Sequence, residues 1–309
     1  MYKKKLWSFT KLFLKFFITG LSLYLVFKKV DIRDVEEAFT SADPAYLLGA
    51  FLFFVVSQVI ASSRLNTFFK SMGLKISALL NFKIYLLGMF YNLFLPGGIG
   101  GDGYKVFMLK KKYNVRGRDL LSSIFFDRLS GLWALSLLTS LLIIFIPSLS
   151  IPRWIPITCI AAGTLVYWVV ISVYFKQYKA NFVLAHTKAL FVQSLQVACA
   201  IFLLRALHLD GKYSPYLFVF LVSSLVAIFP FTVGGLGARE LVFVYGANYL
   251  ALNEHTAVLI SLLFYCISAV MCLSGSYFVF NPKTLTDKRR KTGSSPEELL
   301  DANELDPAV

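Results

Sequence analysis

Charged residues are scarce in this 309-residue chain, and so are histidine and cysteine. Only 16% of the residues are charged, against about a quarter in ordinary soluble domains. The three histidines (His186, His208 and His255) lie far apart and lack the short spacing of metal ligands. The sequence therefore gives no basis for a catalytic triad, a zinc site or a redox pair, and we expect no cofactor.

Apolar residues, by contrast, are abundant. They make up 57% of the chain, and the mean hydropathy is +0.68, which is typical of an integral membrane protein. All four cysteines lie in apolar runs, where a reduced thiol is a small packing residue. The net charge of +14 comes from short basic segments between these runs. That pattern is the positive-inside signature of a membrane protein, so we exclude a nucleic-acid partner.

Six apolar runs approach the length of about 20 residues that a helix needs to cross a bilayer. They are 11–28, 45–63, 121–146, 154–175, 189–207 and 257–280. Two further stretches, 78–108 and 215–251, are each interrupted by a proline and a glycine cluster. Each is too long for one ordinary span, and its two arms are short for two spans. A re-entrant hairpin fits both stretches better.

The two interruptions resemble each other. The first reads Pro96-Gly97-Gly98-Ile99-Gly100-Gly101-Asp102, and the second runs from Pro230 to Gly234-Gly235-Leu236-Gly237-Ala238-Arg239. Proline breaks the preceding helical turn, and glycine permits close backbone approach to a ligand. A helix that restarts after such a break points free N–H groups at an anion such as phosphate. Paired breaks in two halves indicate a transporter's central site, although close packing through small residues is the alternative.

Charge supports the hairpin interpretation. If 78–108 enters and leaves on the cytoplasmic side, every basic segment lies in the cytoplasm, and so do both termini. The sequence therefore predicts an all-α polytopic protein of the cytoplasmic membrane, with about six transmembrane helices and two re-entrant hairpins. The order helix, helix, hairpin, helix occurs twice from opposite sides, which is an inverted-topology repeat. Eight full spans are the alternative.

One membrane domain is expected over residues 1–280. Its two inverted repeats cover approximately 10–146 and 152–280. Residues 281–309 are polar, with a basic run followed by an acidic end, and we predict that they form a disordered cytoplasmic tail.

Charged residues beside the two breaks are the first candidates for substrate binding. Asp102 and Lys105 follow the first break, and Arg239 and Glu240 follow the second. Ionisable groups at membrane depth are costly unless they are paired or face a cavity. We expect Lys105 and Arg239 to bind a headgroup phosphate, while the two acids balance charge, bind a coupling cation or relay protons. Anchoring at the membrane surface is the alternative.

Four more polar residues belong to the predicted site. Asp127 and Arg128 are adjacent within an apolar run, so they point in different directions on a helix, and one of them is expected to reach the first hairpin. Arg64 is either a headgroup anchor or part of a substrate access route. Asn92 precedes the first break and is suited to capping backbone groups there.

Several of these segments together resemble a family signature: residues 92–105, Phe229-Pro230 through Glu240, Ser63-Arg64 and Asp127-Arg128-Leu129. The chain is similar over residues 10–280 to the lysylphosphatidylglycerol synthase transmembrane-region family, also called flippase-like. The resemblance implies a multi-spanning membrane protein that moves lipids between leaflets or assists polyisoprenyl-linked glycolipid metabolism. It does not extend to the synthase domain fused to the best-known members, which we do not expect here.

The chain departs from the family pattern in two places. The acid and base after the first break are Asp102 and Lys105 where Glu and Arg are usual, which weakens planar two-pronged recognition. The last helix reads Phe264-Tyr265-Cys266 where an Arg is frequent. The second departure suggests a different substrate.

The sequence hypothesis is a translocase of an anionic phospholipid or a polyprenyl-linked lipid, with membrane lipids as partners. A separate lipid-modifying synthase is a further candidate partner. A membrane glycosyl- or phospho-transferase that uses Asp102 or Glu240 as its acid or base is the second hypothesis. A scaffold for a synthase, or a transporter of ions or small solutes, also remains open.

Overall fold

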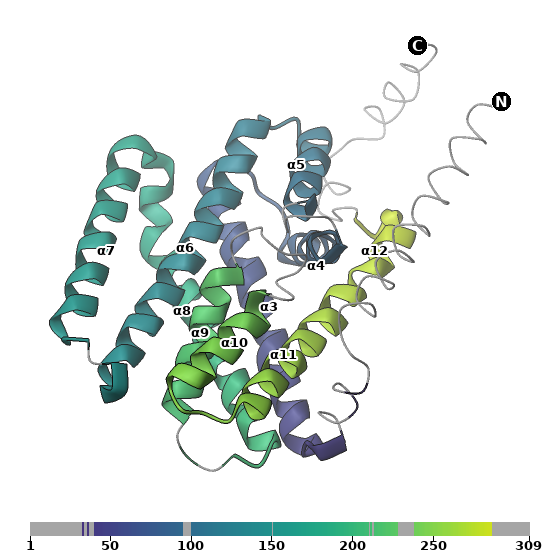
Figure 1. The fold of residues 1–309 in the computed structure, drawn as a ribbon. Helices are drawn as coiled ribbons and strands as arrows, with labels where there is room; N and C mark the ends of the chain where they lie inside the picture. The colour runs from purple at the N-terminus through teal and green to yellow at the C-terminus, as the bar shows by residue number, and fades with distance from the viewer. Residues whose placement is uncertain are drawn as a thin grey trace, which may run out of the picture.

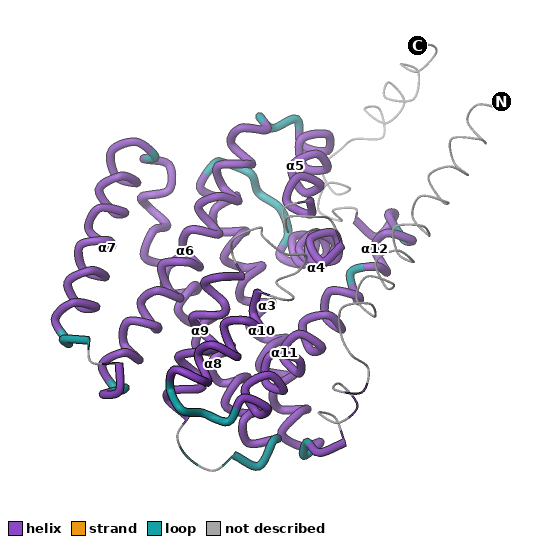
Figure 2. Tube along the Cα trace, viewed as in Figure 1, coloured by secondary structure: helices purple, strands orange, loops and turns teal. Residues whose placement is uncertain are grey.

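The computed structural model describes residues 33, 36, 40–94, 100–149, 151–209, 211, 213–227 and 238–285. Over these residues the chain is helical, and Figure 2 shows helix and loop but no strand in this part. The longer helices are α3 (Pro44–Ser71), α4 (Ala78–Phe94), α5 (Gly100–Tyr113), α6 (Gly117–Ile144), α7 (Trp154–Tyr174), α8 (Phe182–Ala206), α9 (Tyr213–Ala227), α10 (Ala238–Tyr249) and α11 (Glu254–Ser274). The shorter ones are η2 (Pro147–Leu149), η3 (Lys176–Asn181), α12 (Ser276–Phe280) and η5 (Pro282–Leu285).

Five helical segments are long and apolar enough to cross a membrane. They are Pro44–Ser71, Gly117–Ile144, Trp154–Tyr174, Lys176–Ala206 and Thr256–Phe280. Each contains or overlaps one of the six apolar runs, which confirms those five as helices. The remaining run, 11–28, lies outside the described residues. The multi-pass membrane class predicted from composition is therefore supported.

Helices α3 and α8 form the central pair of the bundle. They run antiparallel, so the start of α3 lies beside the end of α8. There the amide of Asp43, before α3, donates to the carbonyl of Ala206 (2.9 Å). At the other end, Lys188 of α8 donates to the hydroxyls of Ser63 and Thr67 of α3, both at 2.9 Å. The start of α3 is set locally, since the Asp43 carboxylate caps the amide of Ala45.

Aromatic side chains lock further helices onto this pair. Phe54 of α3 and Phe220 of α9 both place their rings edge-on to Phe264 of α11, with centroids 5.5 and 4.8 Å apart. All three are buried in the main hydrophobic core. Such contacts add to the free energy gained by burying large aromatic side chains, and they fix how α11 packs against α3 and α9.

The remaining helices pack in two similar sets. In the first set α4 contacts α5, α5 contacts α6, and α4 contacts α3. In the second, α9 contacts α10, α10 contacts α11, and α9 contacts α8. Helices α6 and α11 also cross between the sets, since α6 packs on α8 and α9 while α11 packs on α3 and α4. In Figure 1, α7 stands at one side of the molecule, next to α6.

In each of the two long apolar stretches the structure describes two helices, one on either side of residues that it does not describe. Helix α4 ends at Phe94 and α5 begins at Gly100, while α9 ends at Ala227 and α10 begins at Ala238. The four arms contain 17, 14, 15 and 12 residues, so each is shorter than an ordinary span. Pro96 and Pro230 themselves lie outside the described residues.

The start of the predicted tail needs a correction. Residues 282–285 form η5, which packs against α4 and α12, rather than belonging to a disordered segment. Lys83 of α4 donates to the carbonyl of Thr284 (3.0 Å), and Lys112 of α5 donates to that of Leu285. The polar composition of this stretch suggested disorder, because the two lysines that donate to its carbonyls belong to α4 and α5, far away in the sequence. The rest of the predicted tail, 286–309, lies outside the described residues.

Candidate functional site

Helices α4 and α5, which flank the first break, are in close contact. The carboxamide oxygen of Asn92 accepts a hydrogen bond from the amide of Gly101 (2.8 Å), so the expected capping of backbone groups by Asn92 is present. A Cβ at Gly101 would lie 1.9 Å from the carbonyl oxygen of Gly88 in α4. Small residues therefore serve helix packing here. Gly100 begins α5, whereas Gly97 and Gly98 lie outside the described residues.

Asp102, in the first turn of α5, is the centre of a cluster of charges. Lys105, one turn later, donates to its Oδ1 (3.1 Å). Arg128 of α6 donates Nε–H to its Oδ2 (2.6 Å), and Nη2 of Arg128 contacts the same oxygen. A carboxylate at a helix N-terminus is also favoured by the helix dipole. Asp102 thus holds cations from two helices.

A second ion pair lies one residue away on α6. Asp127 accepts two hydrogen bonds from Arg64 of α3, at 2.8 Å from Nε and 3.2 Å from Nη2. Both side chains are at least nine-tenths buried. Gly131 leaves room for the guanidinium, since a Cβ there would lie 3.1 Å from Nη1. Asp127 and Arg128 point apart, as the sequence predicts: Asp127 faces Arg64 of α3, and Arg128 reaches Asp102 in α5.

The geometry changes the expected roles of Lys105 and Arg64. Lys105 is only 4% exposed, with its ammonium 4.9 Å from the centroid of the Tyr85 ring, so it neutralises Asp102 and is not open to a headgroup. Arg64 is buried against Asp127, so it is not an anchor at the membrane surface. Tertiary pairing, which the sequence does not show, decides which of these cations are exposed.

Arg128 is the accessible cation of this cluster. Its side chain is 41% exposed, compared with 8% for its partner Asp102. Among the described residues, three cations (Arg64, Lys105 and Arg128) contact two carboxylates, those of Asp102 and Asp127. A guanidinium that keeps part of its surface exposed while one carboxylate orients it is suited to two-pronged contact with a phosphate.

Tyr85 and Gln58 are polar members of the cluster that the sequence did not single out. The Tyr85 hydroxyl donates to the carboxamide oxygen of Gln58 in α3 (3.3 Å), and the Tyr85 ring covers Lys105. Nothing local in the sequence marks either residue, because each acts through a neighbouring helix.

The second break is described less fully. Arg239, in the first turn of α10, places its guanidinium carbon 5.0 Å from the centroid of the Phe264 ring, a cation–π contact. Glycines 234, 235 and 237 and the side chain of Glu240 lie outside the described residues. Their roles in binding remain predictions. Among the residues that the structure describes, no group of three or more His, Cys, Asp or Glu side chains is placed to hold a metal ion.

The fold and the site together define a multi-pass helical membrane protein with a cluster of buried ion pairs among α3, α5 and α6. The chain belongs to the family described as lysylphosphatidylglycerol synthase TM region, whose sequence pattern matches residues 12–190 and 176–275. This confirms the resemblance seen in the sequence.

The chain is also similar to a longer relative. It is similar to a phosphatidylglycerol lysyltransferase of Staphylococcus haemolyticus (strain JCSC1435), with 24% identity over 273 residues. The match covers 84% of this chain but 32% of the relative, so the chain spans about a third of that protein's length. The shared part is membrane-embedded, and the relationship supports a function connected with membrane lipids.

Proposed function

We propose that this protein is a lipid translocase of the cytoplasmic membrane, which moves a lipid with an anionic headgroup between leaflets. The observation that carries the proposal is Arg128, a partly exposed guanidinium oriented by Asp102 within a cluster of buried ion pairs. A charged side chain at membrane depth is costly, so its presence there supports a role in moving polar groups. Arg128 takes the role that the sequence suggested for Lys105, and Arg239 remains the candidate cation of the second half.

The packing of the helices supports an inverted repeat. Exchanging α3, α4, α5 and α6 for α8, α9, α10 and α11 converts every main contact among these eight helices into another contact that is also present. The central helices α3 and α8 exchange with each other and run antiparallel, as an axis in the membrane plane requires. Rocking of two such halves would expose the site to each leaflet in turn.

The lengths of the interrupted helices support re-entrant hairpins. At 1.5 Å per residue, arms of 17 and 14 residues extend about 25 and 21 Å, less than the hydrocarbon core of about 30 Å. The ends of α4 and α5 that meet at Asn92 and Gly101 lie beside the charged cluster, since Asp102 follows Gly101 directly. A headgroup bound there would be inside the membrane, with its acyl chains in lipid.

The transferase hypothesis receives less support from the same geometry. Its proposed acid or base, Asp102, already accepts hydrogen bonds from Lys105 and Arg128. A carboxylate engaged by two cations is a weak base, because protonation would cost both interactions. The arrangement suits a counterion that positions cations better than a group that exchanges protons with a substrate.

Leaflet exchange in liposomes tests the proposal. Purified protein is reconstituted, and fluorescent lipids with anionic, zwitterionic and neutral headgroups are followed by dithionite quenching. We expect faster exchange of the anionic lipid than in protein-free liposomes, with smaller effects on the other two. Equal rates for all three headgroups would refute selective binding at the cationic cluster. The absence of exchange by folded protein, with and without an ion gradient, would refute translocation.

A further inference from the structure

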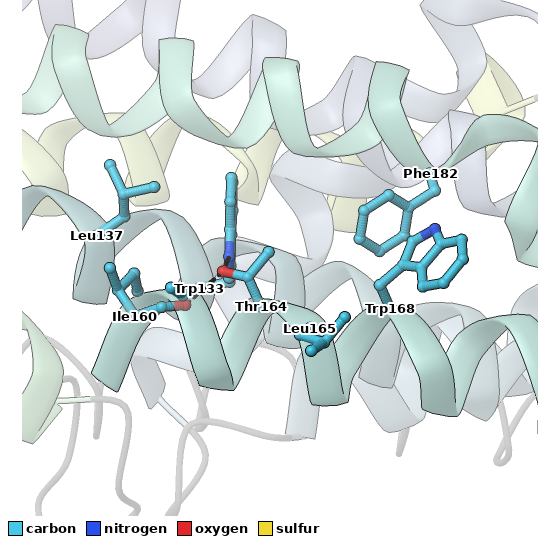
Figure 3. Close-up of a pocket in the computed structure, with 8 residues that line it drawn as sticks. Trp133, Leu137, Ile160, Thr164, Leu165, Trp168 and Phe182 are labelled. Atoms are coloured by element: carbon cyan, nitrogen blue, oxygen red, sulfur yellow. Dashed lines mark hydrogen bonds between the residues drawn. The ribbon is translucent and has the colours of Figure 1, made fainter. Parts of the chain in front are cut away.

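An apolar groove lies between α7 and helices α6 and α8. It has a volume of about 440 Å³ and is lined by Trp133 and Leu137 of α6, Phe182 of α8, and residues of α7 that include Thr164 and Trp168. In Figure 3 the Trp168 and Phe182 rings lie at one end, and Leu137 and Ile160 lie at the other. The Trp133 indole N–H donates to the Thr164 hydroxyl between them (2.8 Å).

Three buried polar atoms that have no hydrogen-bond partner among the described residues lie behind this groove. They are Nη1 of Arg64, the hydroxyl of Tyr167 and Nε2 of His186. Arg64 and His186 are only 7% and 4% exposed. Buried polar atoms are usually hydrogen-bonded, so these three are suited to contact a polar ligand.

Ring contacts connect two of these groups to each other and to the groove. The imidazole of His186 lies 5.2 Å from the Tyr167 ring, 4.9 Å from that of Trp133 and 3.9 Å from that of Phe182, measured between centroids. Arg64 reaches the same part of α6, since its Nη1 lies 3.1 Å from the position of a Cβ at Gly131, two residues before Trp133. Trp133 and Phe182, which line the groove, therefore form the wall that adjoins the polar atoms.

The pattern of donors and acceptors selects the ligand. Nδ1 of His186 lies 2.7 Å from the carbonyl oxygen of Phe182, which can only accept, so Nδ1 carries the proton and Nε2 of the neutral ring is an acceptor. Arg64 Nη1 is a donor, and its charge is balanced by Asp127. A hydroxyl group can accept from arginine or tyrosine and donate to histidine. A phosphate can only accept, and it would find no net positive charge here.

We infer that Arg64, Tyr167 and His186 form a binding site for a hydroxyl group of a membrane lipid, such as a glycerol or sugar hydroxyl, with a hydrocarbon chain of that lipid in the groove between α6 and α7. Both helices are candidate membrane spans, and Trp133, Thr164 and Tyr167 lie in their middle turns. The groove therefore faces hydrocarbon, and a lipid chain is the occupant that this depth supplies. The site is separate from the phosphate site proposed at Arg128, and it rests on the proposed function only for its role in translocation.

Photolabelling with three matched lipids tests this site. Each carries a diazirine in one acyl chain: phosphatidylglycerol has a phosphate and hydroxyls, phosphatidylpropanol has the phosphate alone, and glucosyl-diacylglycerol has the hydroxyls alone. After reconstitution and irradiation, mass spectrometry locates the label. We expect the two hydroxylated lipids to label 133–137 and 160–168 about fivefold more than phosphatidylpropanol, the effect of losing one or two buried hydrogen bonds.

A matched pair of tyrosine variants provides the control. Tyr167→Phe removes one buried hydroxyl and keeps the ring contacts, so it should fold and lose the preference for hydroxylated lipids. Tyr174→Phe, on the same helix but 76% exposed, should keep the preference. Equal labelling by the three lipids, or a preference unchanged in Tyr167→Phe, would overturn the inference and leave water as the occupant. Labelling needs no transport, so it can succeed where leaflet exchange fails, and the reverse also holds.

Discussion

The two broken-helix regions of this protein share an architecture and differ in chemistry. Around α4 and α5, the neighbouring helices α3 and α6 contribute Arg64, Asp127 and Arg128 to a cluster centred on Asp102. Around α9 and α10, the neighbouring α11 contributes the apolar ring of Phe264, which lies beneath Arg239. Among the described residues, the packing frame is therefore shared while the first half carries most of the buried charge. The polar work of the protein is expected to lie in the first half.

The strongest way to disrupt this difference is to break the Arg64–Asp127 pair. Asp127→Ala leaves a buried guanidinium without its charge partner, which typically costs about 3–5 kcal/mol. We expect a large fall in the unfolding midpoint in detergent. Replacing both partners, with Arg64→Met and Asp127→Leu, should restore much of the stability because no buried charge remains. A single variant as stable as the wild type would show that the pair is not the structural element described here.

Close packing at the first break gives the next largest effect. In Gly101→Ala, the added methyl group meets the backbone carbonyl of Gly88, so α4 and α5 must separate at a cost of about 1–3 kcal/mol. Gly103→Ala is the matched control, because nothing lies within 4 Å of a Cβ there. Helix propensity alone favours alanine at both positions. Thermal unfolding that shifted equally in both variants would contradict the close approach.

The cap at the start of α5 is a smaller contribution. Asn92→Ala removes the acceptor of the Gly101 amide and should cost about 1 kcal/mol, as for other lost helix caps. The unfolding midpoint in detergent should fall accordingly. An unchanged unfolding midpoint would mean that the amide finds an equivalent partner.

The second half supplies the smallest expected effect. Arg239→Gln loses the cation–π contact with Phe264, which is worth about 0.5–1 kcal/mol in an accessible setting. The midpoint should therefore move far less than in Asp127→Ala. A loss as large as that of Asp127→Ala would remove the energetic contrast between the two halves.

Hydropathy and composition predicted much of the fold, because a span must bury its backbone and present apolar side chains to lipid. Five runs proved to be helices, and α-helical geometry alone implied that Asp127 and Arg128 diverge. The pairing of Arg64 with Asp127 could not be predicted, since 63 residues separate them and only helix packing brings them together. The same holds for the burial of Lys105 and for the groups behind the groove, Tyr167 and His186.

The most direct test of the central claim is a series of side chains at position 128. The rate of leaflet exchange of fluorescent phosphatidylglycerol is measured for the wild type, Arg128→Lys and Arg128→Gln, with Arg118→Gln as an exposed control on the same helix. The account predicts the order Arg, then Lys, then Gln, with a fall of about tenfold for glutamine because a charge-assisted hydrogen bond is lost. Arg118→Gln should exchange lipid at the wild-type rate. Wild-type exchange by well-folded Arg128→Gln would contradict the claim that the headgroup passes this cluster.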